Sequence, residues 1–362
     1  MTVVIFLGVL FVLILVHELG HFVVAKWTKM RVDEFAIGFP PRLFAIKRGE
    51  TEYSLNALPI GGYVKIWGED GSNSSDLDKE TRSRAFGARP RLAQAAVLIA
   101  GVVMNVLAAW LIFFAVAMIG TPSVVSEEEA GPGAAMTVTY TLPDSPASSI
   151  PLGSEITKVT SDLGDLEDMR PVAFTAFIAQ SNGPIIIGYE HKGRAGEVEV
   201  IPTTGVIVEE PERAAIGIST AMVERVRIPA GEALWQASDR TVRSLVLITV
   251  SIASLLASAF TFSADLSQVT GPIGIAGMVG DAAEFGFVSL LIFTAFISLN
   301  LAVINLLPIP ALDGGRLIFV LIESIIRRPI DPEWMARVNL AGFALLMLLM
   351  LAVTYNDIVK FL

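Results

Sequence analysis

The stretch LVHELGHFVVAKW, Leu15–Trp27, places two histidines and a glutamate directly after an apolar run, Val3–Val16, in which no residue carries a charge. A membrane-spanning helix needs about 20 mostly apolar residues, so Val3–Ala25 is long enough to cross a bilayer. Neither a basic segment before the run nor a small-residue cleavage site after it marks a signal peptide, and a retained span is predicted. Ionisable residues at the centre of such a helix cost about 2.5–3.5 kcal/mol each. Three of them together therefore indicate a site that neutralises them.

The composition places the chain among integral membrane proteins. Its 362 residues are 53% hydrophobic and 17% charged, with a mean hydropathy of +0.63. The formal net charge of −10 argues against a nucleic-acid partner, because phosphate binding needs clustered Lys and Arg. The chain has no cysteine, which excludes disulfides, thiolate metal ligands and cysteine nucleophiles. The histidines available to a metal site are His17, His21 and His191.

Hydropathy predicts four membrane spans. They are Val3–Ala25, Leu92–Ile119, Phe287–Leu307 and Val338–Thr354. The loop from Lys26 to Arg91 holds twelve Lys and Arg, which predicts a cytoplasmic position, and the four arginines of Asp313–Arg337 predict the same side. The insert Thr121–Asp239 has seven Lys and Arg against eighteen Asp and Glu and is predicted to lie outside.

A fifth apolar segment, Ser244–Phe260, is shorter and carries several serines. The loop after it, Thr261–Gly286, has no Lys or Arg and is also predicted to lie outside. Since the loops on both sides of this segment share a face, we expect an interfacial or re-entrant helix there. Four spans then leave both termini outside.

The predicted fold class is an α-helical polytopic membrane protein with about four transmembrane helices, a membrane-associated β loop and an inserted extracytoplasmic α+β domain. The predicted domains are an N-terminal membrane core, the insert, a connector with the interfacial helix, and a C-terminal membrane core, at 1–120, 121–232, 233–285 and 286–362. Strands are expected at Ala134–Leu142, Ser154–Thr160, Ile185–Glu190 and Glu197–Ile201, and a helix at Pro171–Gln180. The inner loop Asp33–Trp67 is aromatic, glycine-rich and β-like.

The spacing of His17 and His21 favours a metal site. Residues four apart lie on one face of a helix, so two imidazoles can reach one Zn²⁺ at about 2.0–2.1 Å. Glu18 flanks the metal and can accept a proton from water, which is the chemistry of HExxH zinc peptidases. A five-residue pattern also occurs by chance, but the cost of burying three ionisable groups in an apolar helix argues against chance here.

A hydrolytic zinc site uses three protein ligands and leaves one position open. His191 lies in the outer insert, so the third ligand is expected to be a carboxylate near the inner end of the first span. Asp313, in Asn305–Arg316 (NLLPIPALDGGR), follows the third span at that same end. Asp313 could instead be the N-cap of a helix at Gly314–Ile326, but a two-histidine site that needs a third ligand favours ligation.

Two motifs, HELGH at His17–His21 and NLLPIPALDGGRL at Asn305–Leu317, together resemble the site-2 protease family of intramembrane zinc metalloproteases, in its bacterial branch with a PDZ domain. GGYVKIWGED at Gly61–Asp70 and GPIGIAGM at Gly271–Met278 look like further family signatures. The resemblance implies that His17, His21 and Asp313 are zinc ligands and that Glu18 is the catalytic base. It further implies that the substrate helix is held and unwound by Asn305, Pro308 and Pro310. It also implies that Phe35–Val64 forms a membrane-embedded sheet that receives substrate in extended form.

The chain departs from the family pattern at two places. Relatives often have Ala-Gly-Pro before the asparagine of the second span, whereas this chain has Ala100–Val102 (AGV) before Asn105. The PDZ-like pattern of Ser145–Val159 carries Ser154 and Glu155 where Gly-Asp is usual. The insert fits one PDZ domain, which is expected to filter substrates by size.

The resemblance implies regulated intramembrane proteolysis in a bacterial inner membrane. The expected partners are membrane lipid and a single-span protein, such as an anti-sigma factor, whose outer part has already been cut. One alternative is a non-proteolytic scaffold with a structural metal and a PDZ partner site, although a structural site needs no base. Another is an ion pathway, which is disfavoured because such sites lie between repeated helices and the sequence has no repeat.

Overall fold

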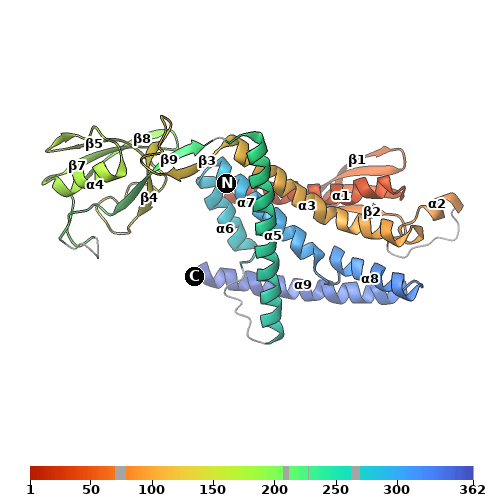
Figure 1. Cartoon of the computed structure of the whole chain (residues 1–362). Helices are drawn as coiled ribbons and strands as arrows, with labels where there is room; N and C mark the ends of the chain where they lie inside the picture. Colours follow the sequence, from red (N-terminus) through yellow and green to blue (C-terminus); the bar gives the residue numbers. More distant parts are fainter. Residues whose placement is uncertain (70–78, 207–211, 227, 262–269, 362) are drawn as a thin grey trace. The chain divides into compact units, whose positions relative to one another are not determined.

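The computed structural model describes residues 1–69, 79–206, 212–226, 228–261 and 270–361. The chain divides into two compact units. Unit 1 combines Met1–Val116 with Ala230–Leu362, and unit 2 is the insert Ala117–Pro229. Unit 1 thus draws its helices from both ends of the sequence, as the red-to-orange and green-to-blue segments of Figure 1 show.

Unit 1 is mainly helical. Its helices are α1 (Thr2–Trp27), α2 (Lys79–Ser83), the 3₁₀ helix η1 (Phe86–Ala88), α3 (Arg91–Ile119), α5 (Ala230–Phe260), α6 (Pro272–Glu284), α7 (Phe287–Leu306), α8 (Asp313–Ile326) and α9 (Pro332–Phe361). Among the described residues, five helices, α1, α3, α5, α7 and α9, are long and apolar enough to cross a membrane. Helices of this kind satisfy their own backbone hydrogen bonds, which hydrocarbon requires, and the protein is an integral membrane protein.

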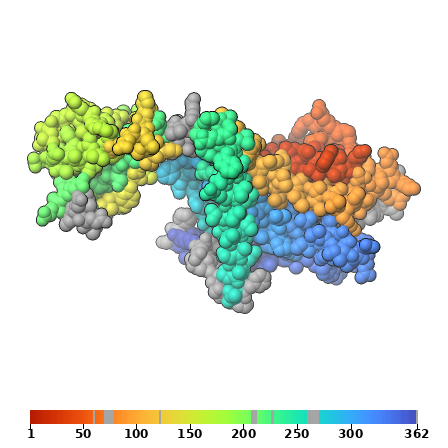
Figure 2. All heavy atoms as spheres, viewed as in Figure 1, coloured from red at the N-terminus to blue at the C-terminus, as the bar shows by residue number. Residues whose placement is uncertain are grey.

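Helix α5 extends beyond the interfacial or re-entrant segment predicted at Ser244–Phe260. It runs without a break from Ala230, and by length and composition alone it could also cross a membrane, so the interfacial placement stays a prediction. Charged residues lower the hydropathy of the first half of α5, so the sequence marked only its second half as an apolar segment. One of them, Arg240, places its guanidinium 4.9 Å from the centroid of the Phe113 ring, where the ring face partly compensates the charge. Figure 2 shows α5, in green, with its outer side chains uncovered along one face of unit 1.

Helices α1 and α3 approach closely because glycines lie at their contact. A Cβ atom at Gly20 would collide with the carbonyl group of Ala100 and with the side chain of Met104. Ala25, one turn further along α1, is fully buried in an apolar cluster that includes Val97 of α3. Small residues at helix interfaces let backbones pack closely in membranes. This contact holds the HELGH face of α1 against α3.

Strands β1 (Val32–Arg48) and β2 (Thr51–Ile66) form an antiparallel hairpin where the sequence predicted a β-like loop. The strands bend so that the first part of β1 is paired on both sides. Ala36 pairs with Tyr63 on one side and with Ser54 on the other. The segment 62–66 therefore forms one edge of the sheet, and among the described residues it pairs only with β1.

Unit 2 is an α+β unit with one sheet, whose strands differ in length. Its elements are β3 (Thr121–Val125), β4 (Ala135–Thr141), β5 (Glu155–Ser161), β6 (Gly164–Asp165), α4 (Pro171–Gln180), β7 (Ile185–His191), β8 (Arg194–Val200) and β9 (Ile218–Val226). The strand order is β3-β9-β4-β5-β7-β8, with β6 paired to β5. Phe174 and Ile178 of α4 are buried in the core against Ile185, Ile187 and Val159 of the sheet.

Candidate active site

His17 and His21 lie one turn apart on the face of α1 that packs against α3. Both residues are buried, with 7% and 8% of their surfaces exposed. Their Nε2 atoms are 3.1 Å apart, and the two rings meet edge to face. A Cβ atom at Gly101 of α3 would lie 2.5 Å from His21 Nε2 and 2.7 Å from His17 Nε2. The second span therefore leaves space for the two imidazoles only because it carries glycine at this position.

Asp313 reaches the same point from the other end of the sequence. It is the first residue of α8, and its Oδ2 atom lies 3.0 Å from His17 Nε2 and 3.3 Å from His21 Nε2. The N-cap residue of α8 is Leu312, which makes no side-chain cap, so the N-cap role considered for Asp313 is wrong. The carboxylate faces the histidines.

The glycines after Asp313 allow this geometry. A Cβ atom at Gly314 would collide with the carbonyl oxygens of Leu306 and Leu307, and one at Gly315 would collide with that of Ile309. The first turn of α8 is therefore folded tightly against the irregular segment 307–312 that follows α7. Irregular backbone at membrane depth is tolerated where it is buried in protein or lines a cavity.

The three side chains fit a metal ion. His21 Nδ1 lies 2.8 Å from the carbonyl oxygen of Val97, which only accepts, so Nδ1 carries the proton of the neutral ring. In this neutral ring His21 Nε2 presents a lone pair toward the Asp313 carboxylate, and a metal ion between them would be bound by both groups. Zn–N bonds of about 2.0–2.1 Å put tetrahedral ligands about 3.3 Å apart, which matches the separations of 3.0–3.3 Å among these atoms.

Asn105 supplies a contact that sequence reasoning missed. It is fully buried in α3, its Nδ2 lies 3.2 Å from His17 Nδ1, and its Oδ1 has no hydrogen-bond partner among the described residues. A half-turn of the amide lets Oδ1 accept the proton of His17 Nδ1, which satisfies the orphaned oxygen and leaves Nε2 free for a metal. Ligating histidines usually donate their other ring N–H in this way. The signal in the sequence was a lone asparagine within an apolar span.

Glu18 and Asn305 share a cavity with the cluster. The cavity has a volume of about 320 Å³ and is lined by Ile14, His17, Glu18, Asn105, Leu301, Asn305, Ala311, Leu312 and Asp313. Pro308 and Pro310 do not line this cavity: Pro308 is exposed in the loop, and Pro310 packs on Gly342 of α9. The structure thus brings together the two histidines, the glutamate, the aspartate and Asn305, whereas the prolines shape the loop.

The edge of the hairpin passes beside Glu18. A Cβ atom at Gly62 of β2 would lie 3.4 Å from Glu18 Cγ and 4.0 Å from a methyl group of Ile14. The backbone of this strand thus lies close to the glutamate.

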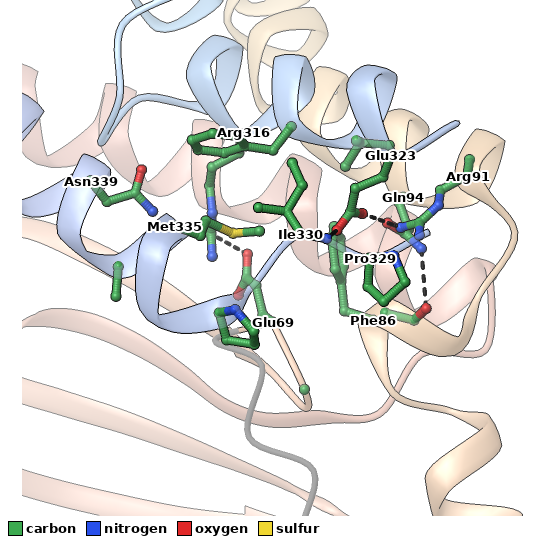
Figure 3. Close-up of a pocket in the computed structure, with 16 residues that line it drawn as sticks. Glu69, Phe86, Arg91, Gln94, Arg316, Glu323, Pro329, Ile330, Met335 and Asn339 are labelled. Atoms are coloured by element: carbon green, nitrogen blue, oxygen red, sulfur yellow. Dashed lines mark hydrogen bonds and ion pairs between the residues drawn. The ribbon is translucent and has the colours of Figure 1, made fainter. Parts of the chain in front are cut away.

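A second cavity, of about 410 Å³, lies along α8 beyond Asp313 (Figure 3). In it Arg316 Nη1 lies 2.5 Å from Glu69 Oε1, and Arg91 Nη1 lies 2.5 Å from Glu323 Oε2. Burial raises the pKa of Glu69, and the charge of Arg316 opposes this effect. Arg316 is one turn after Asp313, so the ion pair ties the start of α8 to the end of β2.

His191, the third histidine of the chain, lies in unit 2 at the end of β7. Its Nδ1 is 3.2 Å from Ser154 Oγ. Among the described residues, the cluster of His, Asp and Glu side chains that could hold a metal ion is formed by His17, His21 and Asp313.

Apolar helices that enclose two histidines, an aspartate and a neighbouring glutamate define a membrane-embedded, metal-dependent hydrolase. The chain belongs to peptidase family M50, whose model matches residues 5–349. It is accordingly an integral membrane metalloprotease, and its cofactor is Zn²⁺.

The relatives agree with this family. A protein of Clostridium acetobutylicum named "Putative zinc metalloprotease" is 37% identical over 348 residues, which cover 96% of this chain and 94% of the relative. The zinc metalloprotease RasP of Oceanobacillus iheyensis is 29% identical over 436 residues, with 99% and 98% of the two chains covered. The regulator of sigma-W protease RasP of Bacillus subtilis is 27% identical over 432 residues, with 99% and 98% covered.

Proposed function

We propose that this protein performs regulated intramembrane proteolysis. Its substrates would be single-span membrane proteins, such as anti-sigma factors, whose outer part has been removed by an earlier cut. The observation that carries the proposal is the convergence of His17, His21 and Asp313 beside Glu18, in a cavity enclosed by apolar helices.

In this proposal His17, His21 and Asp313 hold the zinc ion. Bound Zn²⁺ supplies Lewis-acid activation of water and of the scissile carbonyl. Glu18 accepts a proton from the attacking water on its carboxylate and passes it to the leaving amine. Asn105 keeps His17 in the tautomer whose Nε2 is unprotonated, and the carbonyl group of Val97 does the same for His21.

A peptide bond within a helix must first be exposed. Asn305 lines the cavity, and its amide both donates and accepts hydrogen bonds, so it can pair with backbone groups released by unwinding. The edge of β2 at 62–66 offers further backbone groups next to Glu18, and adding the substrate as a strand there would satisfy its unwound segment. Pro308 and Pro310 contribute by keeping the loop before Asp313 irregular.

The distribution of Lys and Arg supports an orientation in a bacterial inner membrane. The segment 26–91 and the start of α8 would lie in the cytoplasm, and unit 2 would lie outside as a PDZ-like domain. Unit 2 has a hollow of about 360 Å³ between α4 and the start of β9, lined by residues such as Phe174, Ile178 and Ile216. In this orientation unit 2 would exclude substrates with bulky outer domains.

The test is cleavage of a model single-span substrate by the purified full-length protein in lipid vesicles. The wild type should cut a substrate without an outer domain. Glu18→Gln should retain zinc and lose cleavage, because the amide cannot accept the proton. Glu284→Gln, the same change at an exposed position of α6, should cleave normally. Cleavage by Glu18→Gln would remove Glu18 from its role, and cleavage confined to soluble peptides would overturn the intramembrane substrate class.

A further inference from the structure

A cluster of basic side chains surrounds the end of α1, outside the metal site. The side chains line an open hollow of about 420 Å³, formed by Lys26, Lys29, Met30, Glu80, Ser83, Arg84 and Arg89. Nothing in the proteolytic reaction uses these residues. They include four of the cations that follow the first span.

The cluster is held in a fixed arrangement. Arg89 Nη2 donates to the carbonyl oxygen of Thr28 at 2.5 Å, and Arg84 Nε donates to that of Lys29 at 3.4 Å. Lys26 Nζ and Arg84 Nη2 both contact the same oxygen of Glu50, at 2.8 and 2.7 Å. Contacts with the last turn of α1 and with the segment before α3 thus fix the positions of these cationic side chains.

Positive charge is in excess in this hollow. Among the residues that the structure describes, four cations are set against two carboxylates, Glu50 and Glu80, and the first of these is shared by two cations. Arg89 Nε is enclosed and has no hydrogen-bond partner among the described residues. Lys29 is exposed at the edge of the hollow. An anion with several acceptor oxygens in the hollow would balance the charge.

Lys29 occupies a position that normally belongs to glycine. The N–H of Met30 bonds to the carbonyl of Ala25, and that of Lys29 bonds to Lys26, which is the Schellman pattern at the end of a helix. Lys29 has φ of 61°, in the left-handed region that costs a side chain energy.

Exposed apolar residues beside the cluster place it at the depth of lipid headgroups. Trp27, the last residue of α1, is 80% exposed, and Leu92, three residues after Arg89, is 85% exposed. Tryptophan is enriched where a span meets the headgroup layer. Lipid tails would cover these two side chains, and the cations would lie level with lipid phosphates.

We propose that this hollow binds the phosphate group of an anionic phospholipid. Lys29 and Arg89 supply the charge that Glu50 and Glu80 leave unbalanced, while Trp27 and Leu92 contact the acyl chains. Groups of Lys and Arg directly following a transmembrane helix attract anionic lipids in this manner. The site goes beyond the proposed proteolytic function and does not depend on it.

The test measures lipid binding by the full-length protein in detergent, with native mass spectrometry and with the rise of the melting temperature on lipid addition. Phosphatidylglycerol should bind in a saturable way, and phosphatidylcholine should not. Lys29→Gly should weaken phosphatidylglycerol binding by about fivefold, the effect of one cation near a headgroup layer. Because glycine suits a left-handed backbone, this variant should keep or raise its melting temperature in phosphatidylcholine.

Lys192→Gly is the matched control. Lys192 has φ of 52°, so this variant makes the same chemical change at a similar backbone conformation in unit 2, and lipid binding should be unaffected. Equal affinity of the wild type and Lys29→Gly for phosphatidylglycerol would overturn the proposal, as would equal binding of the two lipids. Inorganic phosphate that binds as tightly as the lipid would overturn the lipid assignment, since the acyl chains would then contribute nothing.

Discussion

Asp313 Oδ2 lies 3.0 Å from His17 Nε2, although 296 residues separate the two along the chain. Within unit 1, the contact joins α1 to the start of α8, directly after the irregular segment. In the proposed ligand set it is the contact that converts a two-histidine face into a three-ligand site.

Asp313→Ala should remove one ligand and greatly reduce bound zinc. Two histidines alone leave the ion with too few protein ligands for a stable site. The measurement is zinc content of the purified protein by elemental analysis. Asp281→Ala, at an exposed position of α6, is the control and should retain a full equivalent. A full equivalent in the Asp313→Ala protein would show that another group holds the metal.

Asn105→Leu should weaken zinc binding by about 10–100-fold, because His17 Nδ1 loses its partner. Asn105→Asp should restore much of the affinity, since a carboxylate also accepts the imidazole proton. The affinities can be measured by competition with a chelator, and melting temperatures show whether both variants are folded. If Asn105 only fills space, the zinc affinities of the Asn105→Leu and Asn105→Asp variants will not differ in this order.

Gly101→Ala should abolish zinc binding and activity. The added methyl group would occupy the space between the two imidazoles, 2.5–2.7 Å from their Nε2 atoms. Gly277→Ala on α6 is the matched control, because a Cβ there meets no atom within 4 Å. The control should be neutral or more stable by up to about 1 kcal/mol, the helix preference for alanine. Zinc content and thermal unfolding of the two variants test this pair.

Arg316→Gln should destabilise the protein by about 3 kcal/mol, because it leaves the largely buried Glu69 carboxylate without its partner. Glu69→Gln should cost less, and the double variant should recover part of the loss. A double-mutant cycle of unfolding free energies measures the coupling. Additive single and double effects would mean that the ion pair in Figure 3 contributes nothing to stability.

The stability of the hairpin end should depend on pH through Glu50. The hydrogen bond from Arg84, with that from Lys26, lowers the pKa of Glu50 from 4.5 to about 2. A depressed carboxyl pKa stabilises the fold above the unfolded value, so this contribution is complete above about pH 4.5 and is lost as the pH falls toward 2. Glu50→Gln should lower stability by about 1–2 kcal/mol at pH 7, allowing for solvent screening.

The measurement is the difference in melting temperature between wild type and Glu50→Gln across this pH range. The difference should shrink as the pH falls. Arg84→Gln, which removes the partner instead of the acid, should behave similarly. Parallel curves at all pH values would contradict a role for Glu50 ionisation.

Local patterns predicted the parts of the fold that depend on nearby residues. The helix Pro171–Gln180 begins at its proline and ends at the predicted residue, and the membrane character follows from apolar runs such as Val3–Ala25. The irregular segment after α7 contains Pro308 and Pro310, and a local rule accounts for it, because proline cannot continue a helix.

Long-range packing was not predictable in the same way. Within α5, Arg240 lies over the ring of Phe113, a contact across more than a hundred residues. The two-sided pairing of β1 at Ala36 depends on where its partner strand bends. Asn105 has the polarity of a site residue, but only the packing of α3 on α1 brings it to His17.

The division of unit 1 between the two ends of the chain also sets an order of events during synthesis. The histidines of α1 enter the membrane first, and the aspartate that completes the proposed ligand set is translated 296 residues later. At about 5–20 residues per second, this delay is roughly 15–60 s. With the proposed ligand set, the zinc site therefore stays incomplete for this interval, and the nascent chain would have no proteolytic activity.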